Sequence, residues 1–188
     1  MTHPLLIGLS GYKRSGKTTV ATLLADGFGF HVESFAAPIR RTVAHILGMH
    51  PEELERAKQD PVDWLDGLTP RQLMQTLGTE WGRAQHPELW VRSVFRRMDH
   101  AQRAAGPARL SWVVHDVRFP NEAAAIRLRG GYVVRVCRGH PPDADDHASE
   151  RPLPPGWIDD TLPNFGTFND LSEATMDLVN RLRQRAAA

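Results

Sequence analysis

Residues Gly11 to Thr18, GYKRSGKT, constrain the fold of this chain more than any other stretch, because they match the pattern G-x-x-x-x-G-K-[ST] in full. An apolar run, LLIGL, precedes them, and the segment from Lys17 to Ala25 has the apolar spacing of a helix. A glycine-rich turn between a buried strand and a helix presents backbone N–H groups and the positive end of the helix dipole to an anion. The sequence therefore predicts a loop that binds the phosphates of a nucleoside triphosphate; the alternative is a plain strand–turn–helix.

Each position of the loop has an expected task. Gly11 and Gly16 allow backbone angles that a side chain would forbid. Lys17 would reach the β- and γ-phosphates, and the Thr18 hydroxyl would bind Mg²⁺. Only three of the 23 basic residues are lysines, and two of these, Lys13 and Lys17, lie in this loop. That concentration indicates a specific role for both.

The rest of the chain alternates short apolar segments with helical patterns. Strands are expected at residues 5–9, 31–35, 110–114, 132–136 and 157–162, and helices at 17–25, 38–47, 51–58, 70–77, 87–104, 121–129 and 169–183. This order predicts an α/β domain whose parallel sheet is covered on both faces. We expect a single domain over residues 1–188, with a helical region at about 37–105 and a proline-rich, lid-like loop at about 139–156.

Composition excludes several classes of protein. A net charge of +1 gives no electrostatic argument for binding polymeric nucleic acid. The single Cys137 excludes an internal disulfide and a four-cysteine zinc site. The start, MTHPLLIGLS, lacks the charged region of a signal peptide, and no apolar run approaches the roughly 18 residues of a membrane span. We therefore expect a cytoplasmic protein without a membrane partner.

The loop alone leaves the class of nucleotide-binding protein open. A GTPase switch should carry an N-K-x-D motif, but the only lysine after the loop is Lys58, in AKQD. Motor and helicase domains are usually longer. A small kinase that phosphorylates a small molecule fits 188 residues best, and such an enzyme needs a second anion site, for which arginines are natural ligands.

Three further stretches carry candidate site residues. Arg71, Gln72, Gln75 and Arg83 lie on a helix in PRQLMQTLGTEWGR, either as ligands or as a solvated face. Asp116 and Arg118 follow a strand, where open α/β sheets bind ligands, so Asp116 could support Mg²⁺ and Arg118 could hold a phosphate; the alternative is helix capping. The acidic DDHASE, residues 145–150, indicates a solvated loop or a lid, and the alternative is a metal site formed together with His140 and Asp143.

Taken together, these stretches resemble the bacteriophage-type deoxynucleoside monophosphate kinases of the P-loop nucleoside monophosphate kinase superfamily. The resemblance runs in order over nearly the whole chain, through SGYKRSGKTT, AAPIRRTV, RQLMQTLGTEW, HDVRFPNEAAAIRLRGGYVVRVCR, DDHASE and LPNFGTFNDL. It implies a three-layer sandwich with a five-stranded parallel sheet, helices on both faces and a lid. It also implies transfer of the γ-phosphoryl group of ATP to a deoxynucleoside 5′-monophosphate, in the host cytoplasm if the protein is phage-encoded, and it suggests a homodimer.

The resemblance also assigns residues by matching position. Those implied for ATP are Gly11, Arg14, Ser15, Gly16, Lys17, Thr18, Thr19 and Arg138. Those implied for the monophosphate are Lys13, Ile39, Arg40, Arg71, Gly78, Thr79, Trp90, Asp116, Arg118 and Glu122. Lys13, Lys17 and Arg118 would carry the catalytic charges, with Thr18 and Asp116 at the Mg²⁺. Region 48–69 is short compared with members that carry an insertion there, so the accepted bases are not predicted.

Two other functions remain open from the sequence. One is a small-molecule kinase with a non-nucleotide phosphorylated acceptor, as in the related fold of phosphomevalonate kinases. The other is a regulatory or packaging module that binds a nucleotide without transferring phosphate.

Overall fold

The computed structural model describes residues 3–139 and 153–187. The chain divides into two compact units, one formed by residues 1–34 and 95–188 and the other by residues 35–94. Each unit is described by itself below. Within the described ranges, no helix is both long and apolar enough to span a bilayer.

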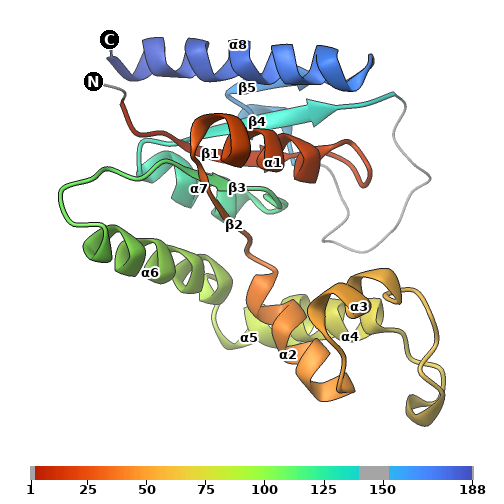
Figure 1. Cartoon of the computed structure of the whole chain (residues 1–188). Helices are drawn as coiled ribbons and strands as arrows, with labels where there is room; N and C mark the ends of the chain where they lie inside the picture. Colours follow the sequence, from red (N-terminus) through yellow and green to blue (C-terminus); the bar gives the residue numbers. More distant parts are fainter. Residues whose placement is uncertain (1–2, 140–152, 188) are drawn as a thin grey trace. The chain divides into compact units, whose positions relative to one another are not determined.

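The first unit is built on a five-stranded parallel sheet (Figure 1). Its strands are β1 (Leu6–Ser10), β2 (His31–Glu33), β3 (Trp112–Val114), β4 (Tyr132–Cys137) and β5 (Asp160–Pro163), in the order β2-β3-β1-β4-β5. In the central strand, Ile7 pairs with Val113 on one side and with Tyr132 on the other. The predicted α/β fold with a five-stranded parallel sheet is confirmed.

Alternation along β1 sends successive residues to the two faces of the sheet. Ile7 and Leu9 are fully buried in a cluster with residues of α1 (Lys17–Phe28) and α8 (Phe168–Ala187). Gly8 faces α7 (Pro120–Leu128), where a Cβ on Gly8 would lie 2.5 Å from Ile126 Cδ1. Helices therefore cover both faces, and a glycine in β1 lets α7 approach closely.

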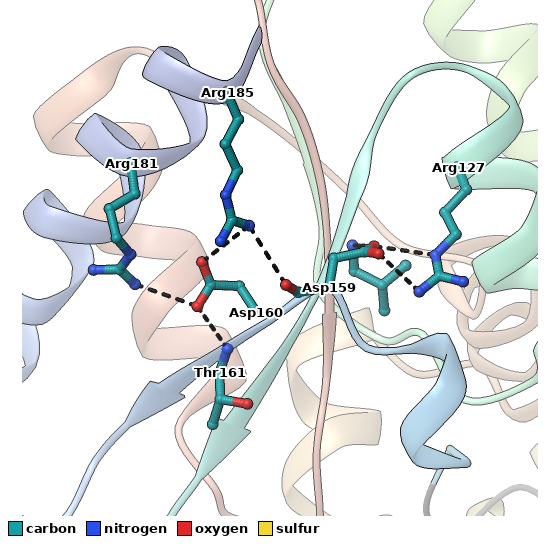
Figure 2. Close-up of polar contacts among 7 residues, drawn as sticks. Arg127, Asp159, Asp160, Thr161, Arg181 and Arg185 are labelled. Atoms are coloured by element: carbon teal, nitrogen blue, oxygen red, sulfur yellow. Dashed lines mark hydrogen bonds and ion pairs between the residues drawn. The ribbon is translucent and has the colours of Figure 1, made fainter. Parts of the chain in front are cut away.

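Paired charges fasten the amino end of β5 to the helices on either side (Figure 2). The Asp159 carboxylate lies 2.7 Å from Nη2 of Arg127 on α7 and accepts a 2.8 Å hydrogen bond from the Val133 N–H. Asp160 lies 3.4 Å from Arg181 and 3.5 Å from Arg185, both on α8. The last strand begins at Asp160 rather than at residue 157, where a short 3₁₀ turn, η4 (Pro155–Trp157), forms instead.

The second unit is helical. It contains α2 (Ala37–Leu47), α3 (Pro51–Arg56), the 3₁₀ turn η1 (Asp63–Leu65), α4 (Pro70–Gln75), the π-helical turn η2 (Thr76–Trp81), α5 (Gly82–Gln85) and the start of α6 (Leu89–Ala104). Val43, Ala44 and Leu54 form its small core, packed by apolar side chains of α4 and η2.

The expected cap at Thr69 is present. The Gln72 N–H donates to Thr69 Oγ1 at 3.2 Å, and the Thr69 N–H donates to Gln72 Oε1 at 2.8 Å. Pro70 occupies the first helical position, where its missing N–H costs nothing. Gly78, expected to interrupt or end this helix, instead lies within the π-helical turn that continues it.

The other helices lie close to their expected positions, with ends that differ by a few residues. The strand predicted over 110–114 is shorter, and the C-terminal helix extends from Phe168 to Ala187. The DDHASE stretch and most of the expected lid at 139–156 lie outside the described residues.

Candidate active site

The loop between β1 and α1 has the backbone geometry that its sequence predicts. Gly11 has φ 141°, Arg14 φ 62° and Gly16 φ 102°, so three residues of one short loop occupy the region that favours glycine. A Cβ on Gly11 would also lie 2.5 Å from the Val136 carbonyl oxygen. The loop therefore requires glycine at position 11 for its angles and for its close packing on β4.

Lys17 folds back across this loop. Its Nζ donates hydrogen bonds to the carbonyl oxygens of Gly11, at 2.8 Å, and Tyr12, at 2.6 Å. The ammonium group is thereby held over the loop at the first turn of α1. The residue that precedes the helix, Gly16, has no side chain to accept from the first-turn N–H groups, so these can serve an external anion.

The remaining loop residues differ in exposure. Lys13, Arg14, Thr18 and Thr19 are exposed, whereas Ser15 is buried. The Ser15 carbonyl accepts a 2.9 Å hydrogen bond from Asn164 Nδ2, in the turn after β5. Arg138, expected at the donor nucleotide, is exposed directly after the end of β4.

A buried carboxylate lies next to the strand that leads into the loop. Asp116 follows β3, and the N–H of the next residue, Val117, donates to the Leu9 carbonyl of β1 at 3.0 Å. The Ser34 hydroxyl, just past the end of β2, donates to Asp116 Oδ2 at 2.6 Å. Three strand ends thus place a carboxylate, a hydroxyl and the phosphate loop at the same edge of the sheet.

This edge provides the oxygen ligands that Mg²⁺ prefers. Thr18 presents an exposed hydroxyl on the first turn of α1, and Asp116 presents a carboxylate. Among residues 3–139 and 153–187, no group of three or more His, Cys, Asp or Glu side chains could form a metal cage. One hydroxyl and one carboxylate are a donor set that fits a Mg²⁺ whose other ligands are water and phosphate.

The turn between β3 and α7 is organised by Glu122. This side chain is buried, and its Oε2 accepts hydrogen bonds from the N–H groups of Arg118, at 2.8 Å, and Phe119, at 3.1 Å. Glu122 thus caps α7 and fixes the backbone of Arg118, whose side chain is exposed. The substrate contacts expected of Arg118 and Glu122 stay predictions.

In the helical unit, three of the residues expected at the monophosphate meet. Trp90 Nε1 donates a 2.7 Å hydrogen bond to the Gly78 carbonyl. A Cβ on Gly78 would lie 2.8 Å from Ile39 Cδ1, so Ile39 packs directly on this glycine. Gly78 lies in η2, and π-helical turns occur often at functional sites. Thr79 follows Gly78 in this turn, and the expected ligands Arg40 and Arg71 are half-buried on α2 and α4.

Sequence reasoning missed several residues of these arrangements. Ser34 lay inside the strand expected over residues 31–35 and carried no signal of its own, whereas β2 ends at Glu33 and leaves Ser34 just past it. Glu33, half-buried at the end of β2, accepts from Arg97 Nε at 3.1 Å and Nη2 at 2.7 Å, a paired contact between residues far apart in the chain. Asn164 lies inside the stretch LPNFGTFNDL, but no pattern in the sequence assigns it a role.

The sheet order and this phosphate loop define a kinase of the P-loop class. Residues 57–175 match the deoxynucleotide monophosphate kinase family, and the chain belongs to that family. It is 34% identical over 164 residues to a candidate deoxynucleotide monophosphate kinase of Acanthamoeba polyphaga mimivirus, covering 78% of this chain and 80% of that one. It is 25% identical to the deoxynucleoside-5′-monophosphate kinase of Escherichia phage T5, over 94% and 95% of the two chains. The protein is thus an enzyme, a nucleotide monophosphate kinase, as the sequence predicted.

Solved structures of other kinases share the fold. A gluconokinase from Sinorhizobium meliloti aligns with a TM-score of 0.50 and 13% identity, over 100% of this chain and 98% of that chain. A sugar kinase from Janibacter aligns with a TM-score of 0.50 and 17% identity, over 95% of each chain. At these identities the likeness supports the fold alone.

Proposed function

We propose that the enzyme transfers the γ-phosphoryl group of ATP to a deoxynucleoside 5′-monophosphate, giving ADP and the diphosphate. The observation that carries the proposal is the position of Lys17, whose Nζ is held over the positive-φ loop by the carbonyls of Gly11 and Tyr12. That geometry suits a triphosphate, and membership of the deoxynucleotide monophosphate kinase family supplies the acceptor class.

On the donor side, the loop backbone would receive the phosphates. The N–H groups of the loop and of the first turn of α1 would bind the anion, except that of Ser15, which donates to the Tyr12 carbonyl at 3.1 Å. Lys17 would exchange its contacts with loop carbonyls for phosphate oxygens. The remaining donor ligands would be Arg14, Ser15, Thr18, Thr19 and Arg138.

On the acceptor side, two sets of residues would take part. Ile39, Gly78 and Trp90 form one packed cluster of the helical unit, which would hold the nucleoside together with Thr79. Arginine side chains provide the charge that a monophosphate requires, and Arg40, Arg71 and Arg118 are assigned to it. Lys13 would face the acceptor from the phosphate loop, while Asp116 and Glu122 complete the site.

The mechanism follows from charge. Two anionic phosphates must approach, so Lys13, Lys17 and Arg118 would neutralise their oxygens and the charge that the transition state develops. Mg²⁺, held by Thr18 and supported by Asp116, would supply further positive charge between the donor phosphates. The protein performs little covalent chemistry, and positioning provides most of the rate.

A panel assay tests this proposal. ADP release from ATP is measured with dGMP, dTMP, dCMP, dAMP and the ribonucleotides, and product diphosphates are identified by chromatography. We expect monophosphate-dependent ADP release that requires Mg²⁺. Absence of turnover with every monophosphate would refute the proposal.

The same assay separates the alternatives. With a phosphorylated alcohol added to the panel, turnover of that acceptor alone would select the phosphomevalonate kinase-like hypothesis. Slow ATP hydrolysis that no acceptor changes would select a regulatory module. Membership of the family favours neither alternative. We place the activity in the cytoplasm, where its nucleotide substrates are found, and the homodimer stays a prediction.

A further inference from the structure

The turn between β5 and α8 contacts the phosphate loop through the buried side chain of Asn164. Asn164 is 8% exposed, and its Nδ2 donates a 2.9 Å hydrogen bond to the Ser15 carbonyl, 149 residues earlier in the chain. A Cβ on Gly16 would lie 2.4 Å from the same nitrogen. The amide therefore fills the space beside the second glycine of the loop.

The turn that carries Asn164 is itself held at both ends. The Asn164 N–H donates to the Cys137 carbonyl at the end of β4, at 2.7 Å. Further along, the Thr167 N–H donates to Asp170 Oδ2 at 2.6 Å, and the Asp170 N–H donates to Thr167 Oγ1 at 3.3 Å. The Asp170 carboxylate accepts hydrogen bonds from the Thr167 N–H and, at 2.8 Å, from the Thr167 hydroxyl, and these two bonds hold the pKa of Asp170 below its usual value. Hydrogen bonds therefore hold the turn in place on both sides of Asn164, whose side chain contacts the phosphate loop.

The geometry of the peptide bond links Asn164 to the anion site. Ser15 C=O and Gly16 N–H belong to one planar trans peptide, so they point in opposite directions. Holding the carbonyl toward Asn164 therefore turns the Gly16 N–H away from it. An anion-binding loop depends on such N–H groups keeping a fixed direction, because each must meet a phosphate oxygen.

We infer that Asn164 is a positioning residue of the phosphate loop, which orients the Gly16 N–H toward the donor phosphates by holding the Ser15 carbonyl. This inference rests on the proposed function in one respect: the ligand of the loop is taken to be a nucleotide polyphosphate. The inference assigns a role to Asn164 in the LPNFGTFNDL stretch, for which the sequence alone indicated none. It also adds a second reason for glycine at position 16, besides its positive φ.

Asn164→Asp tests the inference, because it keeps the shape of the side chain and replaces the N–H donor by a carboxylate oxygen that repels the Ser15 carbonyl. We expect ADP, titrated by calorimetry, to bind about tenfold or more weakly. In turnover assays, the KM for ATP should rise by a similar factor, while the KM for the monophosphate stays within about twofold. A role in folding alone would not separate the two KM values.

Asn169→Asp is the matched control, because it makes the same chemical change on an exposed first-turn position of α8. It should leave ADP affinity and both KM values unchanged. Where Asn164→Asp does not fold, as judged by circular dichroism and thermal unfolding, Asn164→Ser decides by the same criteria.

The outcomes separate this inference from the proposed function. Unchanged ADP affinity and unchanged KM for ATP in a folded Asn164 variant would overturn the inference, as would an equal rise of both KM values. Wild-type protein that binds ADP but turns over no monophosphate would refute the proposed function alone, and the ADP titration would still test Asn164.

Discussion

The Ser34 hydroxyl and the Asp116 carboxylate, 2.6 Å apart, join the carboxyl ends of neighbouring strands β2 and β3 beside the phosphate loop. Both side chains are buried, at 3% and 8% exposure. A buried carboxylate needs hydrogen-bond donors or a cation to offset its loss of hydration. The pair therefore stabilises a negative charge at the edge of the sheet where ligands of parallel α/β folds bind.

Replacing Asp116 should affect catalysis through the metal. Asp116→Asn keeps the size of the side chain but removes its charge, so we expect kcat to fall by about tenfold or more and the Mg²⁺ concentration for half-maximal activity to rise. Ser34→Ala should shift the Mg²⁺ dependence in the same direction, but less. Titration of activity against Mg²⁺ at saturating ATP provides the measurement, with Ser172→Ala on α8 as control. An Asp116→Asn enzyme with a normal Mg²⁺ dependence would remove Asp116 from the metal site.

Removal of the Lys17 ammonium should abolish most activity without unfolding the protein. Its Nζ donates to the carbonyls of Gly11 and Tyr12 in its own loop, and the hydrophobic core of the unit is formed by other residues. Lys17→Ala should lower kcat by about 10³-fold or more, because the variant lacks the cation that stabilises the negative charge of the transition state. Initial rates and thermal unfolding are compared.

Lys58 offers a matched control for Lys17. Its side chain forms an i,i+3 ion pair with Glu55 on the surface of the helical unit, and surface pairs of this kind contribute little. Lys58→Ala should leave kcat and both KM values unchanged. Equal losses in the two variants would show that lysine content, rather than the loop position, matters.

The contact between Trp90 and Gly78 should matter for the acceptor. Trp90→Phe keeps an aromatic ring but leaves the Gly78 carbonyl without its 2.7 Å donor, so η2 loses one restraint near Ile39. We expect the KM for the monophosphate to rise by about three- to tenfold, with stability lowered by about 1 kcal/mol. Trp64→Phe, at a position 65% exposed in the same unit, is the control. A rise in the KM for ATP instead would reassign the cluster to the donor.

The sequence-based predictions agree with the structure where the interacting residues lie close together in the chain. The phosphate loop was predictable because Gly11, Gly16 and Lys17 act over a few residues, and the Thr69 cap because its partner Gln72 is three positions away. The contacts of Asn164 with Ser15 and of Ser34 with Asp116 span 149 and 82 residues. Such contacts depend on the strand order β2-β3-β1-β4-β5, which hydrophobic periodicity does not determine.

The π-helical turn η2 shows a second limit of sequence reasoning. Gly78 predicted an interruption, because glycine weakens a helix interior. The structure instead widens one turn there, and the Gly78 carbonyl finds the Trp90 indole. Ile39 packs against the Gly78 Cα, a tertiary contact that no local sequence pattern predicts.

At the opposite, amino end of the sheet, Asp99 and Arg129 should contribute to stability but not to activity. Their two hydrogen bonds measure 2.7 and 3.1 Å, and the Arg129 guanidinium lies 4.2 Å from the Phe95 ring centroid. The hydrogen bond from Arg129, followed by nearby positive charge, lowers the pKa of Asp99. Because both side chains are more than 40% exposed, Asp99→Asn should cost less than about 1 kcal/mol at pH 7.

The pH dependence of this cost has a definite sign. A carboxyl whose pKa is lower in the folded state stabilises fully above its unfolded pKa, about 3.9, and loses that contribution as pH falls through the folded value. Urea unfolding of the wild type and Asp99→Asn should therefore differ at pH 7 and converge as the pH falls through the folded-state pKa of Asp99, with kcat and both KM values unchanged at neutral pH. If the difference in unfolding free energy between the two proteins grew toward acid pH, the lowered pKa of Asp99 would be contradicted. If Asp99→Asn lost activity, Asp99 and Arg129 would belong to the active site.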